Sequence, residues 1–348
     1  MSLQDPLNAI KSQAKNNAMY SHKDDSDDEL QPSVVKSAEE IKATEEADRP
    51  ERERKEEEAW IAEEKAVKKR KRTIAIVTPI IVACIAFVIV LTTLIIPSQK
   101  LNKAITLIDS GDYQAAYTLL DSIDYRNSKE LQGKIKPQYQ IALISEAEIG
   151  SYAFFGSYEQ DNDTSNGKED IEWIVLAKEG LKALVISKYA LDCKLYHPSM
   201  SDITWETCSL REWLNGPFLN AFSVEERNSI IDTTVTADKN PSFSTSPGND
   251  ATDKVFLLSI TEVNKYFGSN EARKCAPTDF AKAQGVWMSS RYSTDSRTSS
   301  WWLRSPGSLS DHAAIVRSDG SVDIYGRGVF NVLGGIRPAL WIDCGADN

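Results

Sequence analysis

The segment TIAIVTPIIVACIAFVIVLTTLII, residues 73–96, contains twenty-four consecutive positions without a charged side chain. An α-helix rises about 1.5 Å per residue, so a helix of this length spans about 36 Å. The hydrocarbon core of a bilayer is about 30 Å thick, which leaves room for tilt. The segment therefore predicts a single transmembrane helix.

The charges that flank this segment predict its direction. Five consecutive cations, residues 68–72, precede it, whereas Lys100 and Lys103 follow it. Basic residues concentrate on the cytoplasmic side of a membrane, so we expect a cytoplasmic N-terminus and an extracellular C-terminal domain at the cell membrane. A cleaved signal peptide is disfavoured because the apolar run is long, begins late and lacks an A-x-A-like cleavage site.

Residues 1–72 form the predicted cytoplasmic tail, which is charged and poor in large apolar side chains. Such a chain buries too little surface to offset its ordering entropy, so we expect residues 1–36 to be disordered. From Ser37, a capping box with Glu40 predicts a juxtamembrane helix that Pro50 interrupts. Ion pairs four residues apart support this helix: Glu51 with Lys55 and Glu64 with Lys68. The tail is either a solvated charged helix without a partner or a site for a cytoplasmic protein.

The formal net charge of the chain is −11. Residues 97–348 hold 25 basic and 33 acidic side chains, without a stripe of Lys and Arg. Nucleic-acid binding requires clustered cations that release phosphate counterions. The sequence therefore argues against a nucleic-acid partner.

Residues 97–148 have the apolar spacing of a helical hairpin. Apolar side chains recur around Ile105 and Leu119, with Gly111 ending the first run and Asp112 capping the second. The G-D-Y-x-x-A pattern resembles one tetratricopeptide-like unit. Because a single repeat cannot bury its own face, we expect a stalk packed against the next domain, with an independent binding module as the alternative.

Residues 149–348 predict an outer α+β domain of short strands and helices separated by polar loops. A first strand bends at Gly156, and strands at residues 173–177 and 183–187 form a hairpin. A short helix follows around Trp213. Further helix starts are predicted at Ser223, with Glu226 as its capping partner, and near Thr261, after a strand at residues 255–259.

Seven motifs in this region occur in one order: IEWIVL, LVISKYALDCKLY, TWETCSLREWLN, DKVFLLSITEVNKYF, CAPTDFAKAQG, WWLRSPG and GGIRPALWI. Together they resemble an uncharacterised domain of bacterial cell-surface proteins over residues 149–343. That domain is distantly similar to the C-type-lectin-like and formylglycine-generating-enzyme folds. The second of these is also called sulfatase-modifying-factor-like. The resemblance implies a mixed fold in which a G-x-R-P strand packs against a Trp-rich strand, but a shared fold does not imply a shared activity.

Three side chains of these motifs are candidate ligand contacts. Strand alternation places Trp301 and Leu303 on one face and Trp302 and Arg304 on the other. Arg304 can stack on an indole or bind a buried carboxylate or carbonyl groups, and Arg337 invites the same interpretation. Gly334 and Gly335 predict a close approach of the backbone beside Arg337. The alternative is that the Trp and Arg side chains only build the core.

The polar loops offer three further candidates, Tyr292, Asp311 and Asn331. Their loops combine Ser, Thr, Asn, Asp and Gly with occasional aromatic residues, a composition that suits a carbohydrate or a protein ligand. Asp319 and Gly320 predict only a hairpin turn. We therefore expect the outer domain to bind a ligand without catalysis.

The sequence contains no recognisable metal, cofactor or catalytic motif. No H-E-x-x-H, C-x-x-C, EF-hand or G-x-S-x-G pattern occurs, so no metal site or cofactor is predicted. An oxidase of the formylglycine-generating type remains an alternative, although Cys275 and Cys344 do not match that family's copper-binding pair. A third alternative is a structural or sensing protein that signals through its tail. Cys193 and Cys208 are the preferred disulfide pair, with free thiols as the other possibility.

Overall fold

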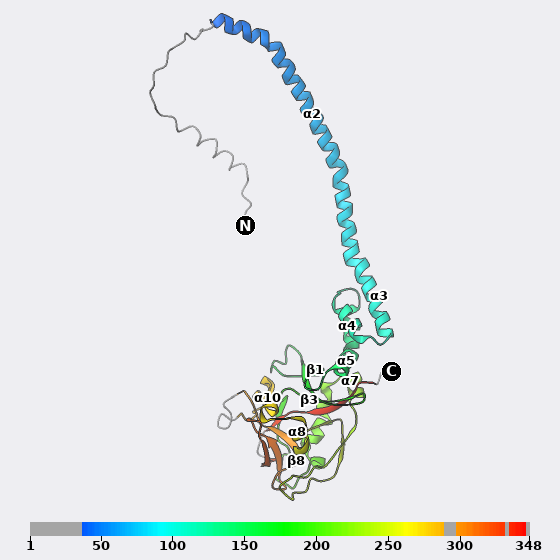
Figure 1. Cartoon of the computed structure of the whole chain (residues 1–348), viewed down its shortest axis with the longest axis vertical. Helices are drawn as coiled ribbons and strands as arrows, with labels where there is room; N and C mark the ends of the chain where they lie inside the picture. The colour runs from blue at the N-terminus through cyan, green and yellow to red at the C-terminus, as the bar shows by residue number, and fades with distance from the viewer. Residues whose placement is uncertain (1–36, 289–296, 331–333, 346–348) are drawn as a thin grey trace, which may run out of the picture. The chain divides into compact units, whose positions relative to one another are not determined.

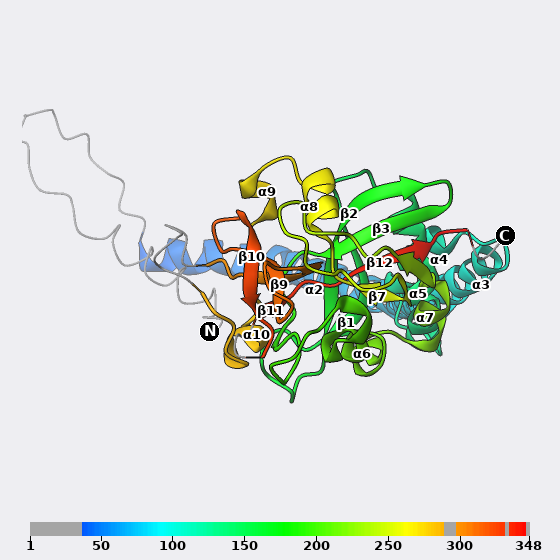
Figure 2. The ribbon, with the colours of Figure 1, turned by 90° about the horizontal axis from the view of Figure 1, so that it is seen from below.

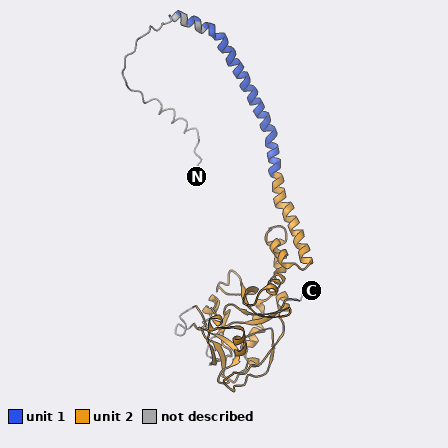
Figure 3. Ribbon diagram, viewed as in Figure 1, with its two compact units in different colours: residues 1–85 blue, residues 86–348 orange. Residues whose placement is uncertain are grey.

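The computed structural model describes residues 37–288, 297–330 and 334–345. The chain divides into two compact units, residues 1–85 and 86–348, which are described separately (Figure 3). Helix α2, Ala38–Val90, provides the described part of the first unit (Figure 1). The second unit contains shorter helices and all the described strands.

Helix α2 begins directly after Ser37, as the sequence predicts. The prediction that Pro50 interrupts it was wrong, because the helix is continuous through this residue and through Pro79. A proline removes one backbone hydrogen bond, but the strong helix formers on both sides of Pro50 continue the helix. The two predicted ion pairs are present, with N–O distances of 2.9 Å for Lys55–Glu51 and 2.6 Å for Lys68–Glu64.

The apolar segment lies within one helical stretch, Glu46–Asp109, that is long and apolar enough to cross a membrane. The structure thus confirms that the segment has the length and the apolar composition of the predicted transmembrane helix. The apolar segment itself is not buried, whereas Leu101 and Ala104 further along the same stretch are buried. A π-helical turn, η1, Leu91–Ile95, follows α2, and the Thr93 hydroxyl donates a hydrogen bond to the Ile89 carbonyl at 2.7 Å.

Three helices follow: α3, Ile96–Asp109; α4, Tyr113–Asp121; and α5, Ser128–Glu146. The first two form the predicted hairpin. Gly111 adopts a φ of 78°, and Asp112 caps α4 by accepting a hydrogen bond from the Ala115 N–H at 3.1 Å. Helix α5 completes this helical segment, where Tyr117 and Tyr139 stack with ring centroids 4.0 Å apart.

Helix α5 also packs against the strands of the mixed domain. Ile144 is fully buried in the main core, and Lys136 forms an ion pair with Asp170 at 2.6 Å. Lys178 donates a hydrogen bond to the Ser145 carbonyl at 2.6 Å. Helix α5 is therefore packed against the domain that follows it.

In the described part of the mixed domain, the strands form two five-stranded sheets and one two-stranded sheet. The longer strands can be followed in Figure 2. The first sheet has the order β1 (Tyr152–Tyr158), β2 (Glu169–Glu179), β3 (Lys182–Ser187), β12 (Ala339–Asp343) and β7 (Val255–Phe256). The second has the order β10 (Val322–Gly328), β9 (His312–Val316), β8 (Trp301–Pro306), β11 (Gly334–Ile336) and β4 (Asp192–Lys194). The small sheet pairs β5 (Thr233–Val235) with β6 (Ala251–Asp253). The predicted mixed α and β class is confirmed.

The first sheet begins with the predicted meander. Strand β1 bends at Gly156, where the register with β2 shifts and φ is 69°. Strands β2 and β3 form the predicted hairpin, with Glu179 opposite Lys182. Trp173 lies fully buried in β2 and donates its indole N–H to the Phe155 carbonyl at 2.7 Å.

Short helices cover the sheets: η2 (Trp205–Thr207), α6 (Ser209–Leu214), η3 (Pro217–Ala221), α7 (Val224–Ser229), α8 (Ile260–Tyr266), α9 (Asn270–Arg273) and α10 (Asp279–Ala283). The capping box of Ser223 and Glu226 at α7 is confirmed. Helix α8 begins near Thr261 as predicted, with Ser259 as its N-cap and Glu262 completing a capping box. The predicted turn at Gly320, with a φ of 81°, joins β9 to β10.

Strand β8 lies in the middle of the second sheet, and all six of its residues are buried. Both faces of the strand are therefore covered. Trp301 and Trp302 have no exposed surface. The predicted close approach beside them is confirmed, since a Cβ atom added to Gly334 would lie 2.6 Å from Trp302 Cδ1.

We expect Gly334→Ala to destabilise the protein by about 1–3 kcal/mol, because the new methyl group overpacks the Trp302 indole. Gly268→Ala is the matched control, since a Cβ atom there meets open space without a positive φ. Urea unfolding of the full chain in detergent measures both. Equal stability of the two variants would show that the indole can shift at no cost.

Candidate functional site

The loop between β1 and β2 carries a dense group of polar residues. Tyr158 pairs with Glu169, so the connection comprises residues 159–168, EQDNDTSNGK. Asn162 and Gly167 adopt φ values of 65° and 104°. Asparagine and glycine tolerate this left-handed region better than other residues, so the composition suits a tightly folded loop.

Side chains within this loop hold it in shape. Asp161 accepts hydrogen bonds from the Asp163 N–H at 2.8 Å and from the Asn166 side-chain amide at 2.7 Å. Gln160 donates its N–H to Glu169 Oε2 at 2.6 Å, and its carbonyl accepts from the Phe280 N–H at 3.0 Å. The loop is thereby attached to the start of β2 and to α10.

A cleft of about 350 Å³ opens beside the loop, bordered by β2 and the start of α10. It is lined by Phe154, Gln160, Asp161, Glu169, Asp170, Glu172, Tyr189, Pro277, Thr278 and Asp279. Phe154 is 49% exposed, an unusual state for a phenylalanine. The cleft thus combines an accessible aromatic side chain with several carboxylates.

The carboxylates of the cleft divide into two groups. Three have lysine partners at 2.6–2.8 Å: Asp170 with Lys136, Glu172 with Lys188, and Asp279 with Lys282. Within the described part of the chain, no ion pair at 4.0 Å or less includes Asp161 or Glu169. These two groups retain acceptor capacity and negative charge at the wall of the cleft.

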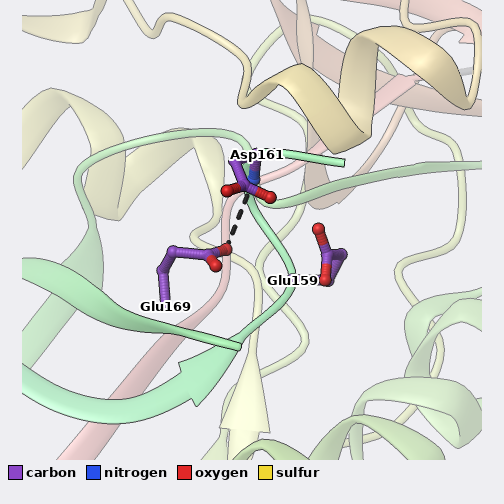
Figure 4. Close-up of side chains that lie close together, drawn as sticks. All are labelled: Glu159, Asp161 and Glu169. Carbon is purple, nitrogen blue, oxygen red and sulfur yellow. Dashed lines mark hydrogen bonds between the residues drawn. The ribbon is translucent and has the colours of Figure 1, made fainter. Parts of the chain in front are cut away.

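Glu159 joins Asp161 and Glu169 in a convergent cluster (Figure 4). One carboxylate oxygen from each lies within 4.8 Å of the others. Burial, together with the charges of Glu169 and Asp161, raises the pKa of the Glu159 carboxyl. Sequence reasoning missed this cluster because no metal-binding pattern contains it. The available signal was an acidic residue on each side of a Gly- and Asn-rich hairpin loop.

Another cleft, of about 460 Å³, lies between the helical segment and the end of β12. It is lined by α3 and α5 residues such as Ile108 and Ser145, with Cys344 on its other side. It is also lined by Asp109, Glu146, Asp343 and Tyr113, but among the described residues the three acidic side chains whose oxygens converge within 4.8 Å are those beside loop 159–168. The acidic cleft is therefore the better candidate site.

The predicted contact Trp302 lies in the core. Its indole N–H donates to the Lys194 carbonyl at 3.0 Å, and its ring meets Tyr196 edge-on with centroids 5.5 Å apart. No part of the side chain is exposed. Its contacts are those of the structural alternative, in which the indole links β8 to β4.

The predicted contact Arg304 is 4% exposed and binds two carboxylates. Its guanidinium pairs with Glu262 and lies 3.7 Å from Asp238 Oδ2, and it donates to the Leu257 carbonyl at 2.9 Å. Asp238 also accepts a short hydrogen bond of 2.5 Å from Ser259. This network joins β8 to the start of α8 and to the loop after β5.

The third predicted contact, Arg337, is 1% exposed. Its guanidinium lies 5.1 Å from the Trp301 ring and 5.2 Å from the Phe267 ring. Its Nε donates to the Ser187 carbonyl at 2.9 Å. Of the two modes predicted for these arginines, Arg337 adopts aromatic stacking and Arg304 adopts carboxylate binding.

Three loop candidates were also predicted. Asp311 precedes β9, and its carboxylate contacts His312 Nδ1 at 2.6 Å, away from the lining of the acidic cleft. Tyr292 and Asn331 lie outside the described residues. The four predicted ligand contacts that the structure describes, Trp302, Arg304, Arg337 and Asp311, all lie outside the lining of the acidic cleft.

The predicted disulfide between Cys193 and Cys208 is absent from the structure, where both side chains are free thiols. Cys193 packs against Ala281 and Val286, whereas Cys208 belongs to the main core and caps α6. Burial raises the pKa of each thiol to about 12. Because the thiolate is the nucleophilic form, both are unreactive at neutral pH.

Cys275 and Cys344 are likewise free thiols. Burial raises the pKa of Cys275, and it raises that of Cys344 to about 11. Cys275 lies near Arg337 in the core, and Cys344 follows β12. These surroundings give neither thiol the lowered pKa of a reactive cysteine.

Comparison with known families gives one match. Residues 181–344 match a family model described as a domain of unknown function (DUF6273). The match covers a little less than half of the chain. It includes β3 to β12 but begins after the loop at residues 159–168, so the acidic loop lies outside it. No curated protein and no solved structure matches the chain.

We expect Arg304→Met to destabilise the protein by about 3–5 kcal/mol, because it leaves the Glu262 carboxylate without its buried partner. Arg327→Met is the control, since its ion pair with Asp323 is exposed on the arginine side and is expected to contribute less than about 1 kcal/mol. Chemical unfolding of the full chain measures both. A stable Arg304→Met protein would instead favour a ligand-contacting role.

The buried thiol of Cys208 predicts a loss of stability at high pH. Its folded pKa of about 12 exceeds the unfolded value of about 8.5, so its contribution is complete below pH 8.5 and declines above it. Each pH unit in this range lowers the free energy of unfolding by up to about 1.4 kcal/mol. We expect Cys208→Ala to show a shallower decline between pH 9 and 11. Parallel curves for the two proteins would contradict this.

Proposed function

We propose that the protein is a single-pass, membrane-anchored surface protein whose outer domain binds a carbohydrate without catalysis. The observation that carries this proposal is the acidic cleft beside residues 159–168, where the exposed Phe154 ring lies among carboxylate and amide acceptors. The cleft belongs to the same unit as the DUF6273 domain.

The chemistry of the cleft supports a sugar ligand. A sugar ring has an apolar face that can lie against an aromatic side chain, and its hydroxyl groups donate hydrogen bonds to carboxylates and amides. Phe154 supplies the first kind of contact, and Gln160, Asp161 and Glu169 supply the second. Small-ligand sites commonly combine apolar walls with a few placed polar groups.

The proposed topology places this domain outside the cell. It is supported by one helix of sufficient length and apolarity and by the basic residues 68–72 on its N-terminal side. The fold is proposed to be C-type-lectin-like or sulfatase-modifying-factor-like, and the mixed sheets with a G-x-R-P crossing support this assignment. The helical segment before it is proposed as a tetratricopeptide-like stalk.

The alternatives are tested by different observations. An oxidase of the formylglycine-generating type requires a reactive pair of thiols, which the raised pKa values of Cys275 and Cys344 disfavour. Two further alternatives are that the outer domain binds a protein and that residues 1–72 bind a cytoplasmic partner. Measuring whether the purified protein retains copper would test the oxidase. Deleting residues 1–72 would test the sensing role.

A glycan array with the full chain in detergent tests the carbohydrate proposal. We expect selective retention of one class of glycan, with affinity reduced at least tenfold by Phe154→Ala because the stacking surface is removed. Leu309→Ala, which removes an exposed apolar side chain outside the cleft, is the control. The absence of any retained glycan, or equal binding by both variants, would reject this ligand class or this cleft.

A further inference from the structure

The cluster of Glu159, Asp161 and Glu169 brings three acidic side chains close together. In the described residues, none of the ion pairs within 4.0 Å involves these three carboxylates. Like charges at this separation repel each other, more strongly where water is excluded. The arrangement therefore requires a counterion, a proton or water to offset the repulsion.

Glu159 supplies an independent observation. The residue is 9% exposed, and its Oε1 atom is covered and has no hydrogen-bond partner. Its carboxylate points toward those of Asp161 and Glu169 (Figure 4). Buried carboxylate oxygens are normally satisfied, so an unpaired Oε1 on a side chain that belongs to an acidic cluster indicates a missing partner.

The separation of the oxygens fits one metal ion. Oxygens that bind a calcium ion at about 2.4 Å can lie at most about 4.8 Å apart. One oxygen from each of the three residues meets this limit, since all lie within 4.8 Å of one another. Backbone hydrogen bonds hold two of the three residues in place, as Asp161 accepts from Asp163 and Glu169 accepts from Gln160.

The donor set selects the class of metal. Three carboxylates with no histidine or cysteine form a hard oxygen site, which favours calcium or magnesium over zinc or copper. Magnesium requires a nearly regular octahedron with short bonds, whereas calcium accepts irregular and incomplete protein ligation completed by water. Three side chains from a loop and a strand end suit calcium better.

We infer that Glu159, Asp161 and Glu169 bind one calcium ion at the wall of the acidic cleft. The ion links both ends of the loop at residues 159–168 and thereby holds one wall of the cleft in place. This site goes beyond the proposed carbohydrate binding, because cation binding can be measured with no sugar present.

The test uses the full chain in detergent, freed of metal with a chelator and titrated with calcium chloride or magnesium chloride by calorimetry. We expect about one calcium ion per chain with a Kd of about 10⁻⁴ to 10⁻³ M, the range of extracellular modules, and at least tenfold weaker magnesium binding. Calcium is also expected to raise the melting temperature. No calcium binding at millimolar concentration, or a preference for magnesium, would overturn the assignment.

Glu159→Gln is expected to weaken calcium binding at least tenfold while leaving the metal-free protein at least as stable, because it removes a buried, unpaired charge. Glu179→Gln, an exposed glutamate at the far end of β2, is the matched control and should bind calcium normally. If Glu159→Gln fails to fold, Asp161→Asn supplies the same test at an exposed ligand. Unchanged calcium affinity in a folded ligand variant would refute the site, whereas failure on the glycan array would leave it intact.

Discussion

The two large sheets are joined where the chain passes from β11 to β12, and the buried guanidinium of Arg337 holds this crossing. Arg337 stacks on Trp301 of the second sheet and donates to the Ser187 carbonyl at the end of β3 in the first sheet. A buried cation is tolerated only when its donors and its charge are compensated. Because these contacts come from both sheets, a shift of either sheet would remove part of the compensation of that charge.

This constraint explains why the conspicuous Trp and Arg motifs form the frame of the domain. Arg304 plays a similar part elsewhere in the domain. It pairs with Glu262 and Asp238 and so links β8 to α8 and to the loop after β5. The same loop is fixed further along by Asn240, whose side-chain amide donates to the carbonyls of two strands. In the proposed function, ligand binding falls to surfaces that this frame positions, such as the loop at residues 159–168.

Local patterns in the sequence predicted local structure well. The bend at Gly156, the β2–β3 hairpin and the Ser223 capping box each depend on residues close together in the chain, and each is present. The lining of the cleft could not be predicted in this way, because Phe154 and Pro277 meet only through tertiary packing. The Cys193–Cys208 pairing failed for a related reason, since nearness in sequence did not place the two thiols in one cluster.

The composition of the acidic loop does not reveal the candidate site, but the register of the flanking strands brings its residues together. The antiparallel pairing of Tyr158 with Glu169 brings Glu159 and Asp161 back to the start of β2, although no sequence pattern marks them as partners. A divalent cation held there would neutralise two charges at the cleft wall while leaving Phe154 exposed. The cleft would then accept a neutral or anionic sugar, whereas the metal-free form favours a cationic ligand. The two proposals together therefore predict that ion binding and ligand selectivity are coupled through the same carboxylates.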